Sequence, residues 1–336
     1  MASTLRTPPI KLGLFERLGL IPAVCKIVCA GLLSLIRRGG GPSSTRLRFW
    51  YTIVRTLNSV LSIRQQHHVL GYTDHVYLRF AKSENFKPDT VALKEGGLGH
   101  WIGNKNAKNV IIYFHGGGYG EGAAITLFQH ARDVMNELNA AGKDHIQGVE
   151  AVRYIIDETG RSPSNIALGG DSAGGNMCLA ILSHINHPHP AITPLELAEP
   201  FAAVYTTAPW VSFDITKPSM KTNVEKDFVS PAALKKWSDS FLGGQESDNY
   251  SEGVKAPAKW WEGIRTKELL ICVGKDDVLF SGVDEFAQNI TSVCSNVTYF
   301  AADGEPHDVP LIWRLAGVKK LSEQEKRINA FLREQF

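Results

Sequence analysis

The sequence has little of what marks several classes of protein. Its five cysteines form no Cys-x-x-Cys pair and are scattered, which argues against a disulfide framework and a structural zinc site. The 36 Lys and Arg nearly balance the 34 Asp and Glu, so no strongly basic face for nucleic acid is indicated. Repeats and long low-complexity stretches are also lacking. What remains is a globular composition in 336 residues, enough for one large α/β domain or two small ones.

One long apolar run stands near the N-terminus, at residues 18–36. This run is about long enough to span a bilayer as a helix. Lys26 lies near its middle, where a charge costs about 2.5–3.5 kcal/mol on insertion scales, and Pro22 interrupts its first turns. Two interpretations stay open: a membrane-bound segment, spanning or interfacial, and a soluble helix packed over the domain. The location is likewise open between a membrane, such as that of the endoplasmic reticulum, and the cytoplasm.

Beyond this run, the spacing of apolar residues predicts one helix over 45–70 and then an α/β pattern. Apolar strands are expected at 75–80, 91–93, 109–114, 165–168, 202–207, 268–273 and 296–300. Helices are expected at about 124–141, 145–158, 173–186, 230–242, 283–293 and 321–333. Continuously apolar strands that alternate with helices predict a mainly parallel sheet covered on both faces, with functional residues at the carboxyl ends of its strands.

The strongest motif is Gly-Asp-Ser-Ala-Gly-Gly at residues 170–175, between an expected strand and an expected helix. This is the setting of a nucleophile elbow, a sharp turn that exposes the hydroxyl of Ser172. Gly170 and Gly174 flank the turn because side chains there would not fit. The helix N-terminus behind Ser172 would stabilise a developing oxyanion. A plain glycine-rich turn is the competing interpretation.

A second motif, His115-Gly116-Gly117-Gly118, directly follows the expected strand 109–114. Three glycines let the backbone approach a substrate closely and direct N–H groups at one oxygen atom. A phosphate-binding loop is not indicated, because no Gly-Lys-Ser/Thr follows.

An acid and a base come after the last two expected strands. Asp277 lies in Gly-Lys-Asp-Asp-Val, and His307 in Gly-Glu-Pro-His-Asp. The chain order Ser172, Asp277, His307 is that of an α/β-hydrolase triad. His307 would take the proton of Ser172, and Asp277 would orient the imidazole. Asp276 is the alternative acid.

These motifs together resemble the hormone-sensitive-lipase-like esterase branch of the α/β-hydrolase superfamily, and its fungal members in particular. The resemblance runs from about residue 90 to the C-terminus. It is carried by His-Gly-Gly-Gly-Tyr at 115–119, Gly-Asp-Ser-Ala-Gly-Gly-Asn at 170–176, Ala-Pro-Trp at 208–210, the stretch 277–279 and the His307 loop.

The resemblance implies an α/β-hydrolase fold and hydrolysis of a small-molecule carboxylic ester without cofactor or metal. The site residues that it implies are catalytic Ser172, Asp277 and His307, oxyanion donors Gly117, Gly118 and Ala173, and supporting His115, Gly116, Gly170, Asp171 and Gly174. It also implies a helical cap formed by residues 1–75 and an insertion at about 212–260, on a catalytic domain at 76–336. Fungal relatives often deacetylate sterols or secondary metabolites. Some relatives have an N-terminal membrane anchor, which favours contact of residues 18–36 with a membrane surface.

The sequence departs from the family between the two glycine-rich motifs. Relatives carry a further strand there, whereas here one helix runs through Gly142-Lys143-Asp144 almost directly into the next. A sheet strand is therefore expected to be missing between residues 141 and 146, which would leave a gap or force its neighbours to re-pair. A splice variant or a misplaced intron in a gene model would explain this, as would a natural variant with altered folding.

The leading hypothesis is a serine carboxylic-ester hydrolase. The alternative is a non-catalytic small-molecule-binding protein, or an inactive truncated isoform, on the same scaffold. Ester and amide substrates, the acyl length and the oligomeric state are left open by the sequence.

Overall fold

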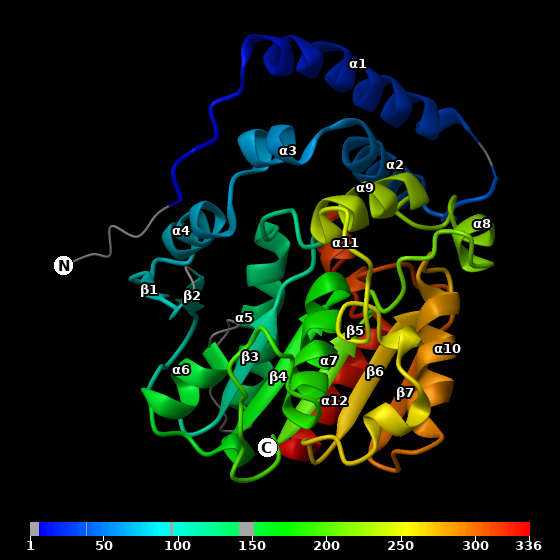
Figure 1. Cartoon of the computed structure of the whole chain (residues 1–336). Helices are drawn as coiled ribbons and strands as arrows, with labels where there is room; N and C mark the ends of the chain where they lie inside the picture. The colour runs from blue at the N-terminus through cyan, green and yellow to red at the C-terminus, as the bar shows by residue number, and fades with distance from the viewer. Residues whose placement is uncertain (1–6, 38, 95–96, 141–150) are drawn as a thin grey trace.

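The computed structural model describes residues 7–37, 39–94, 97–140 and 151–336. Its centre is a parallel five-stranded sheet in the order β3-β4-β5-β6-β7 (Figure 1). The strands are β3 (Val110–Phe114), β4 (Ile166–Asp171), β5 (Ala203–Thr207), β6 (Leu269–Gly274) and β7 (Val297–Ala302). Helices flank both faces, so the expected α/β architecture with a mainly parallel sheet is confirmed.

Alternate residues of the strands enter two separate cores, as the period of two requires. Ile112 and Leu168 pack under α6 (Ala151–Asp157), α7 (Ser172–Asn186) and α10 (Phe280–Thr291). Ile111 and Ala167 face the other way, toward α4 (Thr73–Ser83), α5 (Ile125–Ala140) and α12 (Glu323–Gln335). The remaining helices of the catalytic region are α8 (Ser219–Thr222), α9 (Pro231–Leu242) and α11 (Val309–Leu315).

The N-terminal region is helical, and it differs from expectation in two places. The helix expected over 45–70 is broken into α2 (Thr45–Val60) and α3 (Ile63–Leu70), because Ser62 caps α3 and Gln65 completes the capping box. The strand expected at 75–80 is wrong, since these residues lie within α4. The buried positions Val76, Tyr77, Phe80 and Ala81 follow helical spacing and not alternation.

The long apolar run forms α1 (Leu14–Ile36), which crosses the top of the molecule above α2 and α3 (Figure 1). It is the one helix in the described residues that is long and apolar enough to cross a membrane.

A short hairpin lies apart from the main sheet. Its strands, β1 (Asp89–Ala92) and β2 (Leu98–Trp101), pair only with each other, and β3 pairs only with β4, among the residues that the structure describes. A cavity of about 360 Å³ is lined by β2 and β3 together with the start of α4. Residues 141–146, where a strand is expected to be missing, lie outside the described residues, as does the beginning of the helix expected at 145–158.

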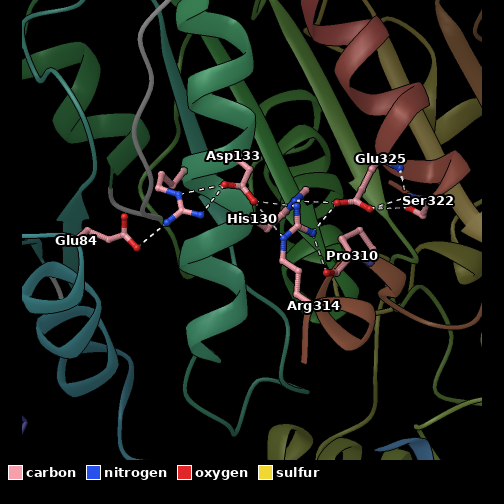
Figure 2. A network of polar contacts seen from close by, with 8 residues as sticks. Glu84, His130, Asp133, Pro310, Arg314, Ser322 and Glu325 are labelled. Atoms are coloured by element: carbon pink, nitrogen blue, oxygen red, sulfur yellow. Dashed lines mark hydrogen bonds and ion pairs between the residues drawn. The ribbon is translucent and has the colours of Figure 1, made fainter. Parts of the chain in front are cut away.

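A partly buried ion network fixes α11, the helix that directly follows His307 and Asp308 (Figure 2). Arg314 of α11 contacts Asp133 of α5 at 3.2 Å and Glu325 of α12 at 2.5 Å. Glu325 in turn accepts the N–H of Ser322 at the start of α12. Because Glu325 is only 3% exposed, it needs its cationic partner. The network therefore stabilises the segment that carries the candidate base.

Candidate active site

Ser172 sits in the turn between β4 and α7. Its φ of +52° lies in the left-handed region, which is unusual for a residue with a side chain and indicates local strain. A Cβ at Gly170 would meet the carbonyl oxygen of Gly174, and one at Gly174 would meet that of Phe114. Both flanking positions therefore require glycine, as the elbow predicts.

The oxyanion loop follows β3 and also needs glycine. Gly117 and Gly118 have φ of +110° and +59°, and a Cβ at Gly118 would collide with the indole ring of Trp237. The N–H of Gly116 donates to Asp171 Oδ2 at 3.0 Å, which ties the loop to the elbow.

The N–H groups of Gly117 and Gly118 donate no hydrogen bond within the described residues. Ala173 lies in the first turn of α7, where N–H groups have no partner inside the helix. Free N–H groups are therefore available at all three expected oxyanion positions.

His307 and Asp277 meet below these loops. The Nδ1 atom of His307 lies 2.9 Å from Asp277 Oδ2, and both side chains are buried. The other carboxylate oxygen of Asp277 accepts the N–H of Leu279 at 2.7 Å. Asp276, the alternative acid, instead forms an ion pair with Lys226 at 2.8 Å. The geometry thus brings Asp277, and not Asp276, to the imidazole.

The second ring nitrogen of His307, Nε2, faces the carboxylate of the next residue, Asp308. Nε2 lies 3.2 Å from Asp308 Oδ2, and Asp308 has the left-handed φ of +36° that turns its carboxylate back to the ring. No hydrogen bond joins His307 to the hydroxyl of Ser172 among the described residues. The imidazole is therefore held between two carboxylates.

These carboxylates decide the charge of His307. Burial alone would lower its pKa, but Asp308 and then Asp277 outweigh that effect and raise the pKa well above 6.5. Two more buried acids lie close by. Burial and the negative charge of Asp308 raise the pKa of Asp171 to about 8. Burial and the charge of Asp277 raise that of Asp227 to about 7.

Residues of the segment between β5 and β6 contact the site, and Ser172 is only 6% exposed. Phe228 lies with its ring 5.8 Å from that of His307. Trp237 of α9 covers Gly118. Lys236 of α9 donates to the carbonyl oxygen of Leu61, at the end of α2, at 2.8 Å.

Residues of the two motifs also make contacts that fix their loops. His115 contacts Thr73 Oγ1 through Nε2 at 3.0 Å, and Tyr119 accepts a hydrogen bond from Asn176 at 2.9 Å. The sequence argument missed Asp227 and Asp308. Asp308 adjoins His307 in the sequence, but nothing in a single chain shows that its carboxylate turns back; Asp227 has no local motif at all.

Comparison with known proteins defines the class. A family model described as alpha/beta hydrolase fold matches residues 133–311. The chain belongs to this family. It is 26% identical over 209 residues to an acetyl-hydrolase from Streptomyces hygroscopicus. That match covers 56% of this chain and 64% of the relative, so the chain spans less than two thirds of it.

Solved structures share the fold. An esterase of the bacterial hormone-sensitive lipase family superposes with a TM-score of 0.65 at 21% identity, over 88% of this chain and 99% of that one. Carboxyl esterase 2 from the mycorrhizal fungus Tuber melanosporum gives 0.58 at 16% identity, over 74% and 86%. At these identities the likeness concerns the fold alone.

Proposed function

We propose that the protein is a serine carboxylic-ester hydrolase, in which Ser172, Asp277 and His307 form the catalytic triad. The buried contact between His307 and Asp277, at the same sheet edge as the strained serine turn, is the observation that carries the proposal. Gly117, Gly118 and Ala173 are the oxyanion donors. The relative named as an acetyl-hydrolase favours a small acyl group, and we propose removal of an acetyl group from a sterol or secondary metabolite.

In the proposed reaction the neutral Nε2 of His307 accepts the proton of Ser172 while Oγ attacks the ester carbonyl. The tetrahedral oxyanion receives hydrogen bonds from the three free N–H groups. His307 then gives its proton to the departing alcohol, and the acyl group stays on Ser172. Water, deprotonated by His307, attacks this acyl-enzyme and releases the acid. Asp277 keeps Nδ1 protonated throughout and stabilises the imidazolium.

An Nε2 atom that donates to Asp308 cannot at the same time accept a proton from Ser172. The described arrangement therefore corresponds to a resting state of the proposed enzyme, in which His307 is protonated. His307 must lose that proton before Nε2 can accept the proton of Ser172.

Hydrolysis of p-nitrophenyl acetate by the purified chain and by Ser172→Ala tests the proposal. We expect turnover by the first and loss of at least about 10³-fold in kcat in the second. Equal rates in both proteins would refute the assignment of Ser172. The alternative, a binding protein on the same scaffold, predicts tight binding of a small molecule without turnover in either.

A further inference from the structure

The outward side of α1 carries an apolar surface that no described element covers. Its large side chains are strongly exposed, up to 87% for Phe15 and 64% for Ile21. The set is Leu14, Phe15, Leu18, Ile21, Val24, Val28, Leu32, Leu33, Leu35 and Ile36. Contiguous exposed apolar surface of this extent marks an interaction site.

These side chains share one face of the helix. Residues 14, 18, 21, 28, 32 and 35 recur at intervals of three, four or seven, which places them in one stripe about 32 Å long on this 23-residue helix. The opposite side packs on α2, where Ala23, Gly31 and Ser34 are buried. A Cβ at Gly31 would collide with Ile53, so the two helices approach closely.

The charges around this face are positive. Lys11, Arg17, Lys26 and Arg37 are exposed, and no ion pair engages them within the described residues. Glu16, the acid of this segment, is paired with Arg64 at 2.8 Å. An apolar stripe with cations beside it complements an anionic lipid surface, where each Lys or Arg strengthens binding about fivefold.

The segments at the two ends of α1 contact α3 and α2, and these contacts limit how α1 can lie in a membrane. At its start, Ile10 O lies 3.0 Å from His68 Nδ1, and Glu16 O accepts from Gln65 at 2.9 Å. Beyond its end, Pro42 O accepts from Arg48 of α2 at 3.2 Å. A helix that spans a hydrocarbon core of about 30 Å would place its ends on opposite sides and break one set of these contacts.

We propose that α1 lies in the plane of an anionic membrane surface, with its outward face in the lipid, and that the enzyme takes its ester from that membrane. The second half rests on the proposed function. α1 packs on α2, and α2 contacts α9, whose Trp237 lies against Gly118 of the oxyanion loop. Docking through α1 therefore brings the α2 and α9 side of the site toward the lipid.

Vesicle flotation tests the docking without any need for activity. The full chain is floated with phosphatidylcholine vesicles and with vesicles that contain 30% phosphatidylserine. We expect strong flotation that the anionic lipid increases. The variant Ile21→Gln/Val28→Gln/Leu32→Gln should bind at least about tenfold more weakly.

The matched control replaces three other exposed apolar residues, as Val69→Gln/Ile192→Gln/Leu321→Gln. Their exposed fractions of 52%, 54% and 40% are close to those on α1, and they lie outside it. This control should float as the unaltered chain does. Equal flotation of the two triple variants would overturn the docking, as would an α1-dependent dimer in size-exclusion chromatography with no flotation.

A fluorophore on Cys25 distinguishes the in-plane from the spanning arrangement. Cys25 is exposed and stands at the midpoint of α1. Cys29→Ser leaves it the one exposed cysteine in the described chain, since Cys178, Cys272 and Cys294 are buried. Quenching by lipids of known depth should place the label about 5–10 Å into the membrane boundary. A label at the bilayer centre would overturn the in-plane arrangement.

The claim that the enzyme takes its ester from the membrane is tested with two esters and the same vesicles. The α1 triple variant should lose at least about tenfold in rate on a sterol acetate dissolved in the vesicles and keep its rate on water-soluble p-nitrophenyl acetate. Equal rates of the variant and the unaltered chain on the lipid-borne ester would overturn this half. Turnover of neither ester by the unaltered chain would instead refute the proposed function, while flotation would still report docking.

Discussion

Replacement of Asp308 by Asn should move the activity of the enzyme to lower pH. Asn accepts the left-handed backbone of this position, so the loop should keep its shape. The carboxylate stands 3.2 Å from His307 Nε2, a distance at which two unit charges attract by about 5 kcal/mol at an effective dielectric constant of 20. That value is a ceiling, because an Asn oxygen still accepts a hydrogen bond. A fall of at least about one pH unit in the pKa of His307 is expected.

The direction of this shift in the pH profile follows from the role of His307 as a base. Its pKa is raised well above 6.5 by Asp308 and Asp277 against the effect of burial, and only the neutral imidazole can accept the serine proton. Asp277 and Asp227 also face this region and remain in the variant. Asp171 faces it too, and its pKa should fall as well, because the charge of Asp308 helps to raise it. At pH values on the acid limb, where most of His307 is protonated, kcat/KM of the variant should therefore be at least about tenfold higher than that of the unaltered chain.

The assay is kcat/KM for p-nitrophenyl acetate from pH 5 to 9, which reports the free enzyme. Asp303→Asn is the control, since it removes an equal charge from a surface residue that is paired with Lys275. It should leave the profile in place. An acid limb that is unchanged, or shifted upward, in Asp308→Asn would refute the reasoning.

Three further predictions concern the triad acid, the serine turn and the ion network of α11. Asp277→Asn should lower kcat by about 10³–10⁴-fold, whereas Asp276→Asn, which breaks only the ion pair, should change kcat little in the same assay. Gly174→Ala forces a Cβ onto the backbone of β3 and should reduce Tm and abolish activity, while Gly19→Ala in α1 should leave both nearly unaltered. Arg314→Met leaves the buried carboxylate of α12 without its cation, and should lower the free energy of unfolding in urea by about 3 kcal/mol. A loss under 1 kcal/mol would contradict that account.

The sequence predicted the centre of the fold well because local signals and buried strands agree there. The elbow around Ser172 is encoded by the residues that its geometry demands, with glycine where a Cβ would strike backbone. The same holds for Gly118 under Trp237. The strand expected at 75–80 failed because its apolar residues suit either structure locally, and packing against the α5 side of the sheet selects the helix.

Other features lay beyond local reasoning. Asp227 reaches the site only through the folding of the cap segment, and the turned-back carboxylate of Asp308 depends on one backbone angle. β2 and β3 belong to separate sheets among the described residues. The missing strand stays a prediction, because residues 141–146 lie outside the described residues. The outward face of α1 depends on contacts at its start, which join residues distant in the sequence.

The most direct test of the central claim is labelling of the purified full chain with a fluorophosphonate, read by peptide mass spectrometry. The reagent reacts with a serine only where a base and an oxyanion site activate it. The account predicts one modified residue, Ser172, and no labelling of Ser172→Ala. A folded chain that stays unlabelled, or that is labelled elsewhere with Ser172 intact, would contradict it.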